Sequence, residues 1–210
     1  MPIEKPIVAA FDFDGTITKR DTLPPFLIFA AGNWPTLKKL LHLTPEMVGY
    51  IFNMTSRQEV KEAILKKFFK GLPHHQLQEI GEAFAHSGKL SNLILPAALK
   101  RLDWHRSQKH RCILVSASID IYLKPWSIKQ GFNDLICSEL EVDESDHVTG
   151  LLSGANCWGP EKERRLVELL GPKENYTLYA YGDSRGDEEL LAAADYPFYR
   201  KMPSPRGLLT

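Results

Sequence analysis

Two aspartates that directly follow a short apolar run constrain the fold of this chain most strongly. The run Ile7–Phe11 has the length and composition of a buried strand, and Asp12 and Asp14 follow it. Side chains two positions apart on extended backbone leave it on the same side, so the two carboxylates can converge on one point. Carboxylate oxygens are ligands that Mg²⁺ prefers, and Gly15 permits a turn there. Taken alone, the motif fits a cation site, a helix cap or a surface turn.

Polar residues follow two further apolar runs in the same manner. Cys112–Val115 is typical of a strand that ends at the hydroxyls of Ser116–Ser118. Tyr176–Tyr181 is typical of another strand, which ends at the acidic turn Gly182–Asp187. A helical pattern that begins close to Lys162 lies between them. Strands that alternate with helices predict a parallel sheet covered on both faces, with ligands bound at the carboxyl ends of the strands.

Taken in order, four motifs resemble those of the haloacid dehalogenase (HAD) superfamily of phosphohydrolases. The motifs are Asp12–Thr16, Ser116, Lys162 and Gly182–Asp187, and the likeness covers nearly the whole chain. The most similar branch is subfamily IB, which contains phosphoserine phosphatase. The resemblance implies an α/β fold, in which a Rossmann-like core with a parallel sheet carries an inserted helical cap of the C1 type.

The resemblance also implies a role for each motif. Asp12 would attack the phosphorus of a phosphomonoester and form an aspartyl-phosphate that water then hydrolyses. Asp14 would act first as general acid and then as general base. Ser116 and Lys162 would bind the phosphoryl oxygens, the first by hydrogen bonding and the second as a positive charge. The implied enzyme class is a phosphoric monoester hydrolase.

The cofactor that the resemblance implies is Mg²⁺. Asp12 and Asp183 would supply carboxylate ligands, and Asp14 would add its backbone carbonyl. Asp187 would bind the ion through water or orient the groups around it. Asp183 and Asp187 could instead cap the last helix, an alternative that the first acidic pair makes less favoured.

A mostly helical stretch of about seventy residues after Thr16 predicts the cap. We expect the cap over residues 19–89 and the core over residues 1–18 and 90–210. Ser56 and Glu59 form a capping-box pattern, which predicts a helix that ends at Gly71. The other elements expected are helices over 23–31, 35–43, 45–54, 72–85, 97–105 and 121–130, a hairpin over 140–142 and 148–152, and a last strand over 196–199.

Two cap residues are candidates for substrate selection. Asp21 lies nine residues after Asp12, where phosphoserine phosphatases carry an acidic residue that meets the substrate amine. Arg57 lies in the region of their carboxylate-binding arginine, although a solvated charge at a helix start fits it equally well. The chain departs from those enzymes in its longer, more apolar cap, and Ser116–Ser118 replaces their Ser-Gly-Gly form. These departures argue against phosphoserine itself as the substrate.

We therefore expect a small phosphorylated metabolite as substrate. Alternatives are a lipid phosphate headgroup of the phosphatidylglycerophosphate type, a phosphocholine, histidinol-phosphate or sugar-phosphate compound, and phosphotransfer to an alcohol through the same intermediate. A catalytically silent metal-binding protein is an alternative of a different class, which the complete acidic and Ser/Lys set disfavours.

Composition narrows the range of partners. Lys plus Arg and Asp plus Glu both number 26, so zero formal net charge gives no global attraction to nucleic acid. The N-terminus has no leader pattern and the three cysteines have no metal-type spacing, which favours a reduced, cytoplasmic protein. No apolar run is long enough to span a bilayer, although the apolar segment 23–54 could touch lipid. Nothing predicts an oligomeric state. We expect the histidines on exposed helix ends rather than at a metal site, because no complete set of metal ligands accompanies them; they are His74, His75, His105 and His110.

Overall fold

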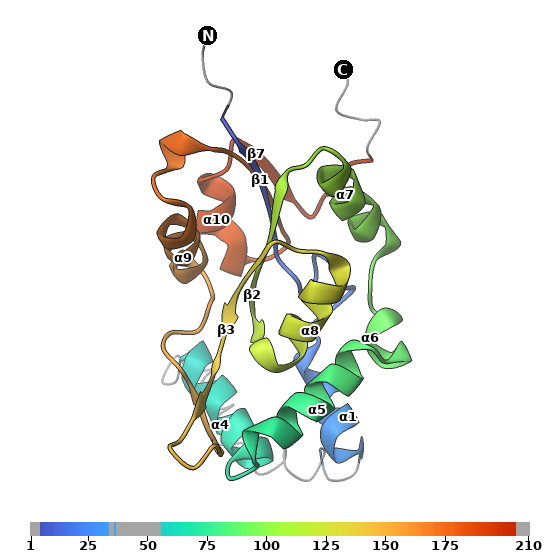
Figure 1. The fold of residues 1–210 in the computed structure, drawn as a ribbon, viewed down its shortest axis with the longest axis vertical. Coiled ribbons are helices and arrows are strands. Elements are labelled where there is room, and N and C mark those ends of the chain that lie inside the picture. Colours follow the sequence, from blue (N-terminus) through green and yellow to red (C-terminus); the bar gives the residue numbers. More distant parts are fainter. Residues whose placement is uncertain (1–4, 34–35, 37–55, 205–210) are drawn as a thin grey trace.

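The computed structural model of the chain describes residues 5–33, 36 and 56–204. Its central sheet has five strands in the order β3-β2-β1-β6-β7, and all neighbours are parallel (Figure 1). A separate antiparallel hairpin is formed by β4 and β5. The strands are β1 Ile7–Phe11, β2 Arg111–Ile119, β3 Asp134–Ser138, β4 Leu140–Val142, β5 Val148–Leu152, β6 Thr177–Gly182 and β7 Tyr196–Tyr199.

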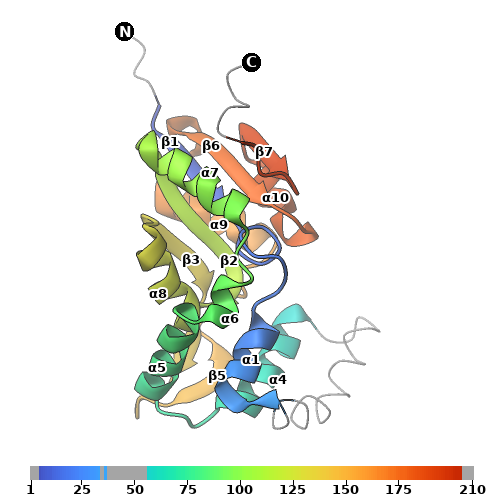
Figure 2. The ribbon, with the colours of Figure 1, turned by 90° about the vertical axis from the view of Figure 1, so that its right-hand side faces the viewer.

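Helices cover both faces of the sheet, as Figures 1 and 2 show. Alternate residues of β1 enter two separate apolar clusters, because successive side chains of a strand point to opposite faces. Ala9 and Phe11 pack in the cluster with α7 (Pro96–Ser107) and α8 (Asp120–Gln130). Val8 and Ala10 pack in the cluster with α9 (Pro160–Leu170) and α10 (Glu188–Ala192). The predicted α/β fold with a parallel sheet is confirmed.

Two parts of the sheet differ from the expectation. Strand β2 does not end at Val115 but continues to Ile119, with a register irregularity between these residues. Ser116–Ser118 therefore lie within the strand, just before its last residue. The edge strand β3 has no counterpart among the expected strands, because its apolar run is short and has a polar residue at each end.

The cap helices lie beyond the carboxyl ends of the strands (Figure 2). They are α1 Leu23–Ala31, α4 Arg57–Phe69, α5 His74–Ala85 and the short α6 Gly88–Ser91. The predicted capping box is present, because the Ser56 side chain accepts from Glu59 N and the Glu59 side chain accepts from Ser56 N. Apart from residue 36, the helices expected over 35–43 and 45–54 lie outside the described residues, and so does most of the apolar segment proposed to touch lipid.

The β4–β5 hairpin packs against the cap helix α4. Gly71 N donates to Val148 O at 2.8 Å, and Val148 N donates to Leu72 O at 2.9 Å. Gly150, with φ of +83°, lies directly against the backbone of Lys66, where a Cβ atom would not fit. These contacts tie α4 to a segment that directly follows β3 in sequence, and so they fix the cap beside the end of the sheet.

One histidine contradicts the expectation of an exposed helix end. His105 is fully buried, its Nε2 lies 2.8 Å from the Tyr181 hydroxyl, and its Nδ1 lies 2.7 Å from His110 Nδ1. Burial lowers the pKa of His105 to about 2, so the ring is neutral. The prediction was wrong because α7 turns this position toward the sheet, as it does Arg101 one turn earlier.

Among the described helices, none has the length and apolar character that crossing a bilayer requires.

Candidate active site

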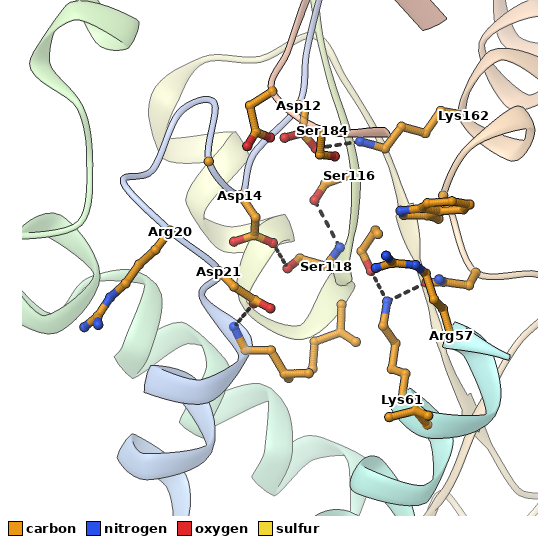
Figure 3. Close-up of a pocket in the computed structure, with 18 of the residues that line it drawn as sticks. Asp12, Asp14, Arg20, Asp21, Arg57, Lys61, Ser116, Ser118, Lys162 and Ser184 are labelled. Atoms are coloured by element: carbon orange, nitrogen blue, oxygen red, sulfur yellow. Dashed lines mark hydrogen bonds and ion pairs between the residues drawn. The ribbon is translucent and has the colours of Figure 1, made fainter. Parts of the chain in front are cut away.

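A cavity of about 500 Å³ lies between the carboxyl end of the sheet and the cap (Figure 3). The loop after β1, the end of β2, the start of α9 and the turn after β6 contribute its core side, and α1 and α4 contribute its cap side. The cavity brings together every residue that the sequence proposed for the site except Asp187, which lies behind it. Those residues are Asp12, Asp14, Asp21, Arg57, Ser116, Lys162 and Asp183.

A buried ion-pair cluster forms the floor of this cavity. Lys162 Nζ lies 2.6 Å from Asp12 Oδ1 and 2.6 Å from Asp187 Oδ1, and all three side chains are almost completely buried. Asp12 is anchored from β1, because its backbone N–H donates to Tyr181 O of the neighbouring strand. Lys162 lies in the first turn of α9, and Gly159 N, just before that helix, donates to Gly186 O. The helix start and the acidic turn are thus held as one unit.

Burial governs the ionisation of this cluster. It raises the pKa of the Asp12 carboxyl to about 7, against the attraction of Lys162. Burial alone would lower the pKa of Lys162, but Asp12 and Asp187 outweigh it and hold the pKa above its usual value. The lysine therefore stays charged at neutral pH, while Asp12 needs further positive charge nearby to be fully ionised.

Three carboxylates of the site suit a divalent cation. Oxygens of Asp12, Asp183 and Asp187 lie within 4.8 Å of one another. Asp183 Oδ1 is buried and has no hydrogen-bond partner among the described residues. Burial, and then the charge of Asp187, raise the pKa of Asp183. Three crowded carboxylates with one orphaned oxygen fit a hard cation such as Mg²⁺, which takes oxygen ligands and would neutralise them.

The Asp14 side chain is held by three donors. Thr22 donates to Oδ1 from its backbone N at 2.8 Å and from its hydroxyl at 2.6 Å, and Ser118 Oγ donates to Oδ2 at 2.5 Å. Burial, and then the charge of Asp21, raise the pKa of Asp14 to about 6. A carboxyl with a pKa close to neutrality is suited to giving and taking a proton.

The Ser116 hydroxyl is buried beside the cluster. Its oxygen accepts from Ser118 N at 3.0 Å, so the irregular end of β2 fixes its place. A hydroxyl that accepts one hydrogen bond still has its own hydrogen to donate. Ser116 can therefore donate to an anionic oxygen in the cavity.

The cap contributes charged side chains of both signs to the opposite wall, among them Asp21, Arg57 and Lys61 (Figure 3). Asp21 Oδ1 accepts from Leu23 N at 2.8 Å, a local contact at the start of α1. The Arg57 guanidinium lies over the Trp158 ring, 4.7 Å from its centroid. Lys61 lies on the same wall.

Sequence reasoning missed Lys61. Its Nζ donates to Ala117 O and to Asn156 Oδ1, each at 2.5 Å, and so it links α4 to the end of β2. Burial lowers the pKa of Lys61 to about 8, although Asp14 and Asp21 oppose this. An ammonium has three hydrogens, so one remains for a ligand. The available signal was its position one helical turn after Arg57, which puts both residues on one face of α4.

Comparison with known proteins identifies the family. Residues 9–192 match the family model of the haloacid dehalogenase-like hydrolases. The chain belongs to this family. Protein CicA of Caulobacter vibrioides (strain NA1000 / CB15N) is 36% identical to this HAD-family chain over 197 residues, which cover 93% of the chain and 86% of that protein. The resemblance to the HAD superfamily is confirmed.

Solved structures show the same fold. A protein with unknown function from Bordetella pertussis Tohama I matches with a TM-score of 0.78 at 19% identity, covering 93% of this chain and 90% of that one. A phospho-aspartyl intermediate analogue of a phosphoserine phosphatase matches with a TM-score of 0.58 at 16% identity, covering 91% and 84%. At such identities the likeness establishes the HAD fold alone.

Proposed function

We propose that this protein is a Mg²⁺-dependent phosphatase that hydrolyses a small phosphomonoester through an aspartyl-phosphate on Asp12. The observation that carries the proposal is the buried cluster at the cavity floor, where Asp12 contacts Lys162 and lies beside Asp183. Membership of a hydrolase family supports it, and so does the similarity in fold to a phosphoserine phosphatase whose structure holds a phospho-aspartyl analogue.

In the first step, an Asp12 carboxylate oxygen forms a bond to phosphorus as the bond from phosphorus to the substrate oxygen breaks. Lys162 and Ser116 donate to the phosphoryl oxygens and stabilise the charge that builds up there. Asp14 gives its proton to the departing alkoxide. Asp12, Asp183 and the backbone carbonyl of Asp14 would hold Mg²⁺, which would supply positive charge that offsets the crowded anions.

In the second step, Asp14 takes a proton from the attacking water. The water oxygen bonds to phosphorus, and the bond from phosphorus to the Asp12 oxygen breaks. This releases inorganic phosphate and restores both carboxyls. Asp187 orients Lys162 throughout, because its Oδ1 lies 2.6 Å from Nζ.

The cap, which we propose comprises residues 19–89, selects the leaving group. Asp21, Arg57 and Lys61 present charges of both signs to the cavity, which favours a polar leaving group that carries charges of its own. A phosphorylated metabolite fits this wall.

The test is a phosphate-release assay over a panel of alkyl, amino-acid, sugar, choline and lipid phosphates. We expect Mg²⁺-dependent turnover of at least one small polar ester and its loss in Asp12→Asn by roughly 10³-fold or more. The matched control is Asp103→Asn, a surface carboxylate that pairs with Arg106 across an exposed contact. Equal turnover by Asp12→Asn and the parent would contradict the proposal, as would the absence of any turnover across the panel.

A further inference from the structure

We propose that Arg200 is a positioning residue for Asp183, and that it holds this carboxylate in the orientation in which it would bind Mg²⁺. The inference deepens the proposed function, because it rests on Asp183 as a metal ligand. Arg200 directly follows β7, the last strand of the sheet, and belongs to none of the four motifs.

The sheet brings Arg200 to the acidic turn. Strands β6 and β7 run parallel, side by side at one edge of the sheet (Figure 2), and Gly182 pairs with Tyr199. Asp183 and Arg200 are the next residues after this pair. They therefore leave the two strands together, at the carboxyl end of the sheet where the cavity lies.

Arg200 donates to two successive carbonyls of the turn. Its backbone N–H donates to Gly182 O at 2.8 Å, and its guanidinium Nε donates to Asp183 O at 2.7 Å. The second bond has a charged donor, which makes it stronger than a bond between neutral groups. It fixes the peptide group that follows the Cα atom of Asp183.

Asp187 holds the same turn by its N–H groups. Its Oδ2 accepts from Asp183 N and from Ser184 N, each at 3.1 Å. Both backbone polar groups of Asp183 are thus bonded, the N–H within the turn and the carbonyl to Arg200. The direction of the Asp183 carboxyl therefore depends on this held backbone and on packing against Gly15.

The backbone conformation of Arg200 is unfavourable for an arginine. Its φ is +53°, in the left-handed region that glycine adopts freely and other residues adopt at a cost. A strained backbone that persists beside a candidate site is a reason to look for a function. The bond from the guanidinium to Asp183 O is the contact that only the side chain supplies.

The charge of Arg200 acts in two ways. Burial and Asp187 raise the pKa of Asp183, and the charge of Arg200 opposes them, which favours the ionised carboxylate. The same charge would repel Mg²⁺. Because Arg200 is exposed, water and salt screen this repulsion. We therefore expect the orienting hydrogen bond to dominate.

The test is Mg²⁺ binding to the substrate-free protein, measured by isothermal titration calorimetry. Arg200→Ala removes the guanidinium and keeps the strained backbone, whereas Arg200→Gly removes the guanidinium and the strain together. We expect the Kd for Mg²⁺ to rise about tenfold in both variants. Arg200→Gly should nevertheless melt about 2–4 °C above Arg200→Ala. A residue that served stability alone would not lower Mg²⁺ affinity in both.

Lys109 supplies the matched control. It is an exposed basic residue with φ of +60°, and it lies between α7 and β2, at the end of the sheet away from the cavity. Lys109→Ala and Lys109→Gly should show the same difference in melting temperature as the two Arg200 variants. Both should leave the Kd for Mg²⁺ unchanged.

Asp183→Asn, titrated in parallel, should lose Mg²⁺ binding and separates the inference from the proposed function. If it does so while the Arg200 variants keep the parent's Kd or bind Mg²⁺ more tightly, the positioning role is refuted and the proposed function stands. Weaker binding by Arg200→Ala alone would also refute that role, because backbone strain would then be the cause. If Asp183→Asn binds Mg²⁺ as the parent does, or the parent binds none, the proposed metal site is refuted, and the inference with it.

Discussion

Replacement of Gly15 by alanine should disable the site while changing little else. The backbone of Gly15 has φ of +83° and lies against the carboxyl of Asp183. A Cβ atom there would be 2.6 Å from Asp183 Cγ and 2.8 Å from Oδ1. Asp183 Oδ2 would be nearer still, so the carboxyl would have to retreat by about 1.1 Å to reach the 3.4 Å of an ordinary contact. That carboxyl is a proposed Mg²⁺ ligand.

Two separable effects follow from this geometry. The positive φ costs an alanine about 1–2 kcal/mol, which lowers the melting temperature of a domain of this size by about 2–8 °C. The displacement of Asp183 acts on turnover, since a misplacement near 1 Å costs roughly 10²-fold. It should also raise the Mg²⁺ concentration needed for half-maximal activity.

Gly71 supplies a matched control. It has φ of +80°, close to that of Gly15, but a Cβ atom at this position would meet nothing within 4 Å. Gly71→Ala therefore carries the same backbone strain without the displacement. Melting temperature by circular dichroism and Mg²⁺-dependent kcat of the two variants should separate strain from displacement.

We expect both variants to melt a few degrees lower and only Gly15→Ala to lose turnover. The reasoning would be refuted if Gly15→Ala kept kcat and Mg²⁺ dependence within about threefold of the parent. It would also be refuted if Gly71→Ala lost as much activity as Gly15→Ala.

Three further predictions concern the metal, the buried lysine and the cap. EDTA should abolish turnover and Mg²⁺ should restore it, whereas Ca²⁺ should restore it poorly because its coordination is larger and more variable; full activity in metal-free buffer would contradict this. Lys162→Met should lose about 3 kcal/mol of unfolding free energy in EDTA. Because that change removes the cation beside Asp12, the pKa of its carboxyl should rise further above the value of about 7 that it has in the parent, so the deficit should stay constant from pH 4 to about 6 and grow as the pH rises through 7 to 8, as urea unfolding would measure; a deficit independent of pH would be the contrary result. Asp21→Ala and Lys61→Met should each lower kcat/KM for the preferred substrate at least tenfold more than for an aryl phosphate, and a uniform loss would assign these residues to structure.

The fold was predictable where local sequence signals are strong. Ile7–Phe11 is apolar on both faces, as a central parallel strand must be, and the capping box at Ser56 marks the start of α4. Strand β3 was not predicted because an edge strand with polar ends shows no clear apolar run. The buried place of His105 was not predictable either, since it depends on how α7 packs on the sheet.

The residues of the site likewise fall into those that the sequence could predict and those that it could not. The motif residues could be proposed from sequence, because each follows a strand or starts a helix that leads to one edge of a parallel sheet. Lys61 gave only a weak signal, its place one helical turn after Arg57 on the same face of α4, because it reaches the cavity through contacts with Ala117 and Asn156, which lie far away in the chain. Contacts between residues far apart in the chain carry no local pattern.

The most direct test of the central claim is chemical identification of the covalent intermediate. The protein would be mixed with a substrate from the phosphate-release panel and Mg²⁺, quenched in acid during turnover, and reduced with borohydride, which converts an aspartyl-phosphate to homoserine. Peptide mass spectrometry should find homoserine at position 12, dependent on substrate and absent from Asp12→Asn. Turnover of the same substrate with no reduced residue at position 12, or with the label on another side chain, would contradict the assignment of Asp12 as the nucleophile.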